Sequence, residues 1–86
     1  MTLEEFFTTH YKPQRLLGKS PNTSRLYLIS IRNFAKSIGK TPELSDLTDS
    51  NVILHMQTML DLGRTPATAN KDRAQLLTLW RHAHRL

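Results

Sequence analysis

The sequence SPNT at residues 20–23 is nearly repeated as TPAT at residues 65–68, and each copy precedes a long segment with helical periodicity. Proline suits the first position of a helix, because the N–H that it lacks has no intrahelical partner there. The preceding Ser20 or Thr65 suits the N-cap, since its side-chain oxygen accepts a hydrogen bond from the first turn. The two motifs therefore predict the starts of two helices.

The two predicted helix starts also have the composition of anion sites. Lys19 precedes the first and Arg64 precedes the second, and free N–H groups at the N-terminal end of a helix attract phosphate. If the two ends lie side by side, they form a clamp on a nucleic-acid backbone. A simpler interpretation, in which the hydroxyl residues only cap their helices, stays open at this point.

Apolar periodicity and end signals predict four helices in one domain spanning residues 1–86. Thr2 and Glu5 have the spacing of a capping box at the start of the first helix. No segment has the strict alternation of a half-buried strand, so the expected fold is a compact, all-α four-helix domain. The helices are expected to start at residues 2, 21, 48 or 49, and 66, and the first three are expected to stop at Pro13 (an end or a kink), Gly39 and Gly63.

The predicted core consists of the apolar face of each helix. Tyr27, Ile31 and Phe34 recur at spacings of four and three, which places them on one face. Aromatic residues at helical spacing, Trp80 included, are expected to pack in the core rather than stack on nucleic-acid bases. The predicted core residues are Leu3, Phe6, Phe7, Tyr11, Leu16, Leu17, Tyr27, Ile31, Phe34, Ile38, Leu44, Leu47, Val52, Ile53, Met56, Met59, Leu60, Ala69, Leu76, Leu79, Trp80 and Ala83.

Charge is unevenly distributed along the chain. The net charge is +5 and the pI is near 10.1, which favours a polyanionic partner. Residues 12–40 hold seven basic and no acidic residues, whereas residues 43–61 hold four acidic and no basic residues. This segregation predicts one nucleic-acid-binding face and one solvated face, with a generally basic surface as the alternative.

Several other classes of function lack support in the sequence. Without cysteine there are no disulfides or thiolate metal sites, which fits a reducing cytoplasm. No apolar run approaches the ~20 residues of a membrane span. His10, His55, His82 and His84 lack ligand spacing, and no catalytic motif is present, so we expect no metal, no cofactor and no enzymatic activity. The last helix has no glycine or proline stop before Leu86, as expected of a domain cut from a longer protein.

Residues 65–83 read TPATANKDRAQLLTLWRHA. This segment resembles the last helix of the core-binding domain of tyrosine recombinases, the phage integrase family. The pattern Thr-x3-Tyr-x3-Ile-x2-Phe at residues 23–34 resembles an earlier helix of the same domain. The opening TLEEF at residues 2–6 and the loop LSDLT at residues 44–48 also fit, so the resemblance covers essentially the whole chain.

The resemblance implies a helical, SAM-like domain that grips one side of double-stranded DNA, with catalysis in a separate domain. It places the protein in the cytoplasm of a bacterium, as a bacterial or phage-derived protein at the nucleoid. Neighbouring recombinase protomers are expected partners on DNA, which would leave Leu3, Phe6 and Phe7 partly exposed in the isolated, monomeric domain. The expected DNA-binding residues are Lys19, Ser20, Asn22, Thr23, Arg25, Arg64, Thr65, Thr68, Asn70 and Lys71.

Two other functions stay open at this stage. The basic face could dock an acidic protein partner, which makes the domain a protein-interaction module. The chain could also be a stand-alone DNA-binding regulator, which needs self-association and a short turn between two steeply crossing helices. The long connection over residues 40–47 argues against that second alternative.

Overall fold

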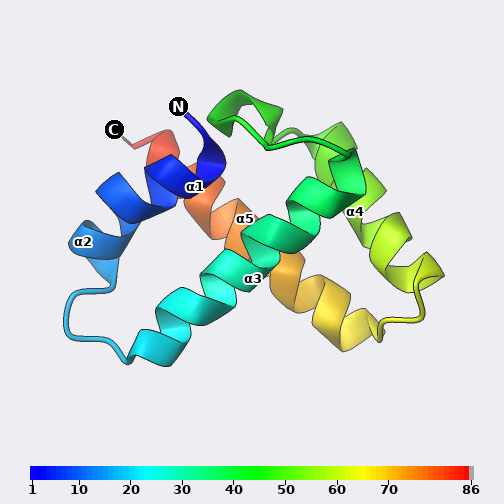
Figure 1. Cartoon of the computed structure of the whole chain (residues 1–86), viewed down its shortest axis with the longest axis horizontal. Helices are drawn as coiled ribbons and strands as arrows, with labels where there is room; N and C mark the ends of the chain where they lie inside the picture. Colours follow the sequence, from blue (N-terminus) through cyan, green and yellow to red (C-terminus); the bar gives the residue numbers. More distant parts are fainter. Residues whose placement is uncertain (86) are drawn as a thin grey trace.

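Helices account for most of residues 1–85, the part of the chain that the computed structural model describes (Figure 1). The elements in chain order are α1 (Leu3–Phe6), the π-helical η1 (Phe7–Tyr11), α2 (Lys12–Arg15), α3 (Pro21–Ile38), the 3-10 helix η2 (Leu44–Asp46), α4 (Asp49–Asp61) and α5 (Pro66–Ala83). Because α1, η1 and α2 follow one another without a break, the described residues form the four helices that the sequence predicts. Leu86 lies outside the described residues.

The predicted helix starts are confirmed by their caps. Ser20 Oγ accepts from the N–H of Asn22 at 3.1 Å, and Thr65 Oγ1 accepts from the N–H of Thr68 at 3.2 Å. Thr2 forms a capping box with Glu5, and Thr48 caps α4. Gly39 follows α3 with a φ of 73°, the left-handed conformation that glycine adopts without a steric penalty.

The first helix does not end at Pro13 but continues to Arg15. It can do so because the five-residue π-helical turn of η1 precedes the proline. The N–H of Lys12 donates to the carbonyl of Phe7, one residue further back than in an α-helix. Pro13 therefore lies in the first turn of α2, where its missing N–H is tolerated.

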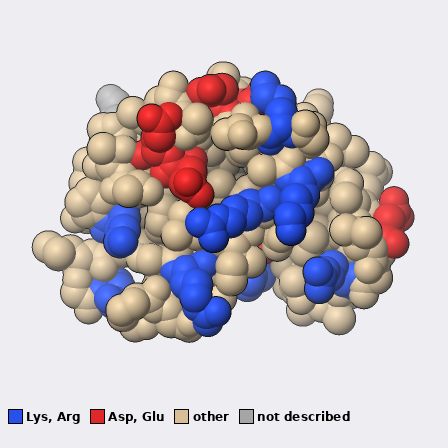
Figure 2. Space-filling view, in the orientation of Figure 1, with Lys and Arg blue, Asp and Glu red and all other residues tan. Residues whose placement is uncertain are grey.

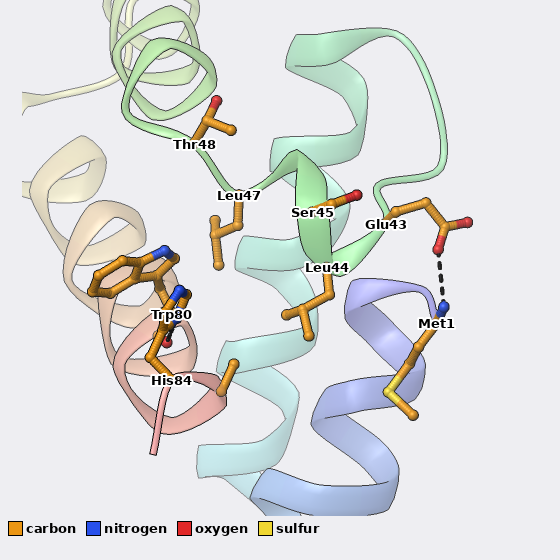
Figure 3. Close-up of a pocket in the computed structure, with 9 residues that line it drawn as sticks. Met1, Glu43, Leu44, Ser45, Leu47, Thr48, Trp80 and His84 are labelled. Carbon is orange, nitrogen blue, oxygen red and sulfur yellow. Dashed lines mark hydrogen bonds and ion pairs between the residues drawn. The ribbon is translucent and has the colours of Figure 1, made fainter. Parts of the chain in front are cut away.

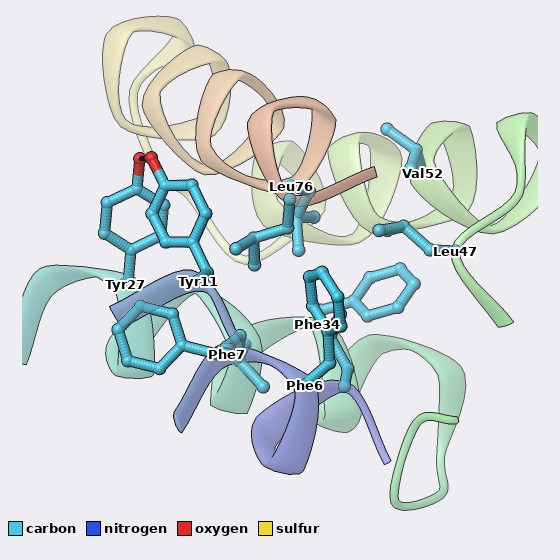
Figure 4. Close-up of a cluster of buried hydrophobic side chains, with 11 residues drawn as sticks. Phe6, Phe7, Tyr11, Tyr27, Phe34, Leu47, Val52 and Leu76 are labelled. Carbon is cyan, nitrogen blue, oxygen red and sulfur yellow. Dashed lines mark hydrogen bonds between the residues drawn. The ribbon is translucent and has the colours of Figure 1, made fainter. Parts of the chain in front are cut away.

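The four helices pack around one core. Figure 1 shows α3 crossing in front of α5, with the first helical segment (α1 to α2) to the left of the crossing and α4 to its right. Phe34, Leu76 and Leu79 are fully buried at this meeting point, with Phe6 and Phe7 from the first helix (Figure 4). Leu47 and Leu44 hold the loop before α4 against this core, as predicted.

Four of the predicted core residues lie at the surface instead. Leu17 and Ile53 are 86% and 57% exposed, and Leu60 and Trp80 are 47% and 41% exposed. On α5 the buried face runs through Ala69, Asp72, Leu76, Leu79 and His82, so two polar residues occupy places that apolar ones were expected to fill. Trp80 follows Leu79 by one residue, about 100° around the helix, and lies at the edge of the core.

The expected partial exposure of Leu3, Phe6 and Phe7 is also wrong. Their exposed fractions are 0%, 2% and 1%. Their helix folds back on α3 and α5, and it is tied to the loop before α4 by the hydrogen bond from Leu3 N–H to the carbonyl of Pro42. Within residues 1–85, none of the helices combines the length and apolar character needed to cross a lipid bilayer.

The contrast between Phe34 and Trp80 gives a stability test. Truncating the fully buried Phe34 in F34A should lower the free energy of unfolding by about 3–5 kcal/mol, because it opens a cavity at the helix crossing. W80A should cost only about 1 kcal/mol, because the indole is 41% exposed. Urea unfolding followed by far-ultraviolet circular dichroism measures both, and equal losses would contradict this description of the core.

Candidate nucleic-acid interface

The N-terminal end of α3 presents side chains rather than free backbone donors. The N–H of Asn22 is bound by Ser20 Oγ, and the N–H of Thr23 donates to the carbonyl of Ser20 at 3.0 Å. Pro21 has no N–H to offer. The expectation of free N–H groups at this helix start is therefore wrong, because the cap already uses them.

Arg25 is held in place by a neighbour on the same helix. Its Nη2 and Nε atoms contact Asn22 Oδ1 at 2.5 Å and 3.2 Å. Both side chains are exposed, and the spacing of three residues places them on the same face of α3. The carboxamide thus pre-orients a guanidinium at the helix start, where Lys19 adds a second cation.

The N-terminal end of α5 is built in a similar way. Thr65 Oγ1 binds both the N–H of Thr68 and its hydroxyl, the latter at 3.0 Å. Asn70 and Lys71 follow on the exposed side of the helix, and Arg64 precedes the cap on the surface. The threonine hydroxyls are engaged with each other, which leaves Arg64, Asn70 and Lys71 as the outward-facing groups of this end.

The two helix starts are not side by side, contrary to the expectation. Figure 1 shows α3 beginning at the left and α5 at the right of the same lower edge. The reason is the crossing of the two helices, which brings their middles together and spreads their ends apart. Thr23 and Thr68 are each half-buried and neither is sealed in the interior. The structure thus forms two separate basic corners on one edge. Lys19 and Arg25 lie at the corner where α3 starts, and Arg64 and Lys71 lie at the corner where α5 starts.

Positive side chains dominate the surface around the starts of α3 and α5. Figure 2 shows Lys and Arg atoms along the course of α3 and over the lower half of the molecule, whereas Asp and Glu atoms gather at the upper edge and at the far right. The ion pairs among residues 1–85 include Glu4 with Arg32 at 3.7 Å and Asp46 with Lys40 at 3.1 Å. In the same residues Lys19, Arg25 and Arg64 have no carboxylate within 4.0 Å.

A buried polar cluster lies where the three long helices meet. Asp72 and His55 are both 0% exposed, and His55 Nε2 lies 3.1 Å from Asp72 Oδ2. Ser30 Oγ donates to Asp72 Oδ1 at 2.8 Å and also contacts the carboxamide of Gln75. His55 Nδ1 is 2.6 Å from Ser37 Oγ. The cluster links α3, α4 and α5 through groups that satisfy one another away from water.

The environment of Asp72 favours its charged form. Burial by itself raises the pKa of this carboxyl, but hydrogen bonds from His55, Ser30 and Asn33 outweigh burial and hold the pKa below its usual value. Lys71 adds a cation at 3.9 Å from Asp72 Oδ1. Asp72 is the one acidic residue between Arg64 and Arg85, and it is buried inside the fold rather than displayed on the basic surface.

The spacing of polar residues in the sequence carries a signal for this cluster. Ser30 lies between Tyr27 and Phe34 on the buried face of α3, His55 lies between Val52 and Met59 on α4, and Asp72 lies between Ala69 and Leu76 on α5. Each polar residue thus occupies a core position by spacing alone. Three polar residues in core positions of three helices predict a shared network, because each needs a partner when buried.

His55 has a carboxylate partner on a different helix, Asp72. Among residues 1–85, no group of three or more His, Cys, Asp or Glu residues could hold a metal ion. Tyr11 and Tyr27, both predicted core residues, are buried with their hydroxyl oxygens 3.1 Å apart (Figure 4).

An open groove borders Trp80, a predicted core residue that lies at the edge of the core. It has a volume of about 610 Å³ and lies between the loop before α4 and the last turns of α5. Figure 3 shows the indole beside the imidazole of His84, with Leu44 and Leu47 on the opposite wall. The two rings are 4.0 Å apart between centroids. Trp80 thus lies partly exposed at the border of this groove.

Comparison of the chain with protein-family models, characterised proteins and solved structures found no match.

The buried carboxylate predicts an acid-sensitive fold. The folded-state pKa of Asp72 lies below the unfolded value of 3.8, so its contribution is present above that pH and is lost as the pH falls through the folded-state pKa. D72N should lose about 1–3 kcal/mol at neutral pH and show a shallower decline between about pH 5 and pH 2. Urea titrations at several pH values test this, and parallel pH curves for the two proteins would contradict it.

Proposed function

We propose that this domain binds duplex DNA and acts as one half of a clamp that positions DNA for a tyrosine recombinase or integrase. In this proposal the catalytic domain is a separate part of the protein, and the residues described above have no catalytic role. The observation that carries the proposal is the pair of basic corners at the starts of α3 and α5, on one edge, where Lys19, Arg25 and Arg64 have no carboxylate within 4.0 Å among residues 1–85. The order of the four sequence motifs and the all-α four-helix fold also support it.

The proposal gives the exposed side chains of the two corners different tasks. Lys19 and Arg25 at one corner, and Arg64 and Lys71 at the other, neutralise backbone phosphates. Asn70 extends from the start of α5 and can reach base edges, where a carboxamide pairs with adenine, whereas Asn22 orients Arg25. Ser20, Thr23, Thr65 and Thr68 shape the helix starts that hold these groups. The separation of the corners suits two phosphates on either side of a groove rather than a single one.

The salt dependence of binding tests the electrostatic part of the proposal. If about four cations neutralise phosphates, log K should fall with log salt at a slope near −3.6, about −0.9 for each contact. Fluorescence anisotropy with a labelled duplex at several salt concentrations measures the slope. Binding that does not change with salt would remove the electrostatic basis of the proposal.

Charge reversal distinguishes the two corners from general positive charge. R25E/K71E should weaken duplex binding by at least about tenfold, because each reversal replaces an attraction to phosphate by a repulsion. The matched control is K36E/R73E, which changes the net charge equally through exposed residues of the same two helices. Arg73 lies two residues after Lys71, about 200° around α5.

Equal losses in both variants would show that net charge alone drives binding. Unchanged binding in R25E/K71E would favour the rival function, in which the basic face docks an acidic protein partner. Sedimentation of the free domain addresses the remaining alternative, because a stand-alone regulator requires self-association.

A further inference from the structure

A second basic feature lies between the first helical segment and the last turns of α5, away from the corner at the start of α5. It is a pocket of about 250 Å³ lined by Tyr11, Arg15, Thr78, Arg81, His82 and Arg85. The segment from Thr65 to Thr78 rises by about 20 Å along α5, so the pocket is well separated from the helix start proposed to bind DNA. It therefore calls for its own explanation.

Three arginines, one from α2 and two from the end of α5 and the turn after it, line this pocket. They are Arg15, Arg81 and Arg85. Among residues 1–85, no carboxylate lies within 4.0 Å of these three arginines. The guanidinium group is planar and binds oxyanions through paired hydrogen bonds. The pocket thus gathers positive charge that no carboxylate of the described residues neutralises.

A buried histidine in the wall of the pocket has an unused polar atom. His82 is only 6% exposed, and its Nε2 lies 3.0 Å from Gln14 Oε1. Its Nδ1 is buried without a hydrogen-bond partner among residues 1–85. Buried polar atoms in folded proteins are nearly always paired, so an unpaired one indicates a missing partner. This atom is independent of the arginines as an indication that the pocket receives a ligand.

We propose that this pocket binds a phosphate group, held by Arg15, Arg81 and Arg85 and completed by His82. The polar lining and small volume fit a tetrahedral oxyanion with little attached to it. The phosphate belongs either to a nucleic-acid backbone or to free phosphate or a small phosphomonoester. The chemistry of recognition is the same for both sources, and the experiments below separate them.

Binding in this pocket should be coupled to proton uptake by His82. In the free protein, burial lowers the pKa of His82, and the nearby Arg15, Arg85 and His10 lower it further. The other charged or titratable groups around it are Arg81 on α5 and Tyr11, whose hydroxyl meets that of Tyr27 from α3. A bound anion offsets the arginine charges and favours the imidazolium, in which Nε2–H donates to Gln14 and Nδ1–H is available to an oxyanion.

A structural role for the same arginines is the competing explanation. Arg15 and Arg81 lie in the last turns of α2 and α5, where cations stabilise the helix dipole without any ligand. That role predicts no preference for phosphate over chloride and no link between an anion and the pKa of His82. The two explanations therefore differ in what an added oxyanion does.

The first experiment compares phosphate with chloride at equal ionic strength, using the thermal unfolding midpoint of the whole chain. We expect phosphate to raise the midpoint of the wild-type protein, because it binds the folded state alone. R81Q/R85Q removes two exposed arginines and should weaken phosphate binding about tenfold or more. R32Q/R73Q is the matched control, with the same charge loss at exposed sites outside the pocket, and it should keep the response. Equal responses to phosphate and chloride, or equal responses in the two variants, would overturn the proposal.

The second experiment follows the His82 ring by proton NMR during pH titrations with and without sulfate, again at constant ionic strength. Sulfate is used because its charge does not change near neutral pH. We expect sulfate to raise the pKa of His82 in the wild-type protein and in R32Q/R73Q, but not in R81Q/R85Q. An unchanged pKa in the wild-type protein would overturn the role given to His82.

Duplex binding of the same variants identifies the source of the phosphate. If R81Q/R85Q loses more duplex affinity than R32Q/R73Q, the pocket holds a backbone phosphate. If the two variants bind the duplex equally while only R81Q/R85Q loses the phosphate response, the ligand is a free phosphate or phosphomonoester. R25E/K71E should keep its phosphate response in both cases, so failure of the DNA proposal and failure of the pocket are distinguishable.

Discussion

The contact between Asp72 and His55 is the constraint on which the rest of the structure depends. Both side chains are fully buried, and they join α5 to α4, while Ser30 joins Asp72 to α3. A buried carboxylate without partners is prohibitively costly, so these three helices can meet only where the partners coincide. An apolar contact tolerates sliding, whereas this network specifies one register for the crossing. The network lies near the middle of α3 and in the first half of α5.

The crossing in turn decides how the basic residues are displayed. Because α3 and α5 meet near their middles, their N-terminal ends diverge along one edge of the molecule (Figure 1). Lys19 and Arg25 go to one corner, and Arg64 and Lys71 go to the other. Asp72, the acidic residue that could have offset the charge of α5, is turned inward by the same network. Fold stability and surface charge are thus linked through one side chain.

The helices could be predicted from the sequence because their signals are local. Ser20 with Pro21, and Thr65 with Pro66, mark helix starts through hydrogen bonds within one turn, and Gly39 marks an end through its own backbone. The buried faces were harder to predict, since burial depends on neighbours that periodicity does not identify. Trp80 has the spacing of a core residue, but His82 and Asp72 take the inner positions of α5 and leave the indole at the rim.

The sequence by itself determined the four helices, their caps, the absence of strands among the described residues and the segregation of charge, because each follows from composition or from contacts a few residues apart. Only the tertiary structure decided that the two helix starts form separate corners. It also decided that Arg15 lines one pocket with Arg81, His82 and Arg85. Arg15 is far from the other three along the chain, and the packing of α2 against the end of α5 is what brings it to them.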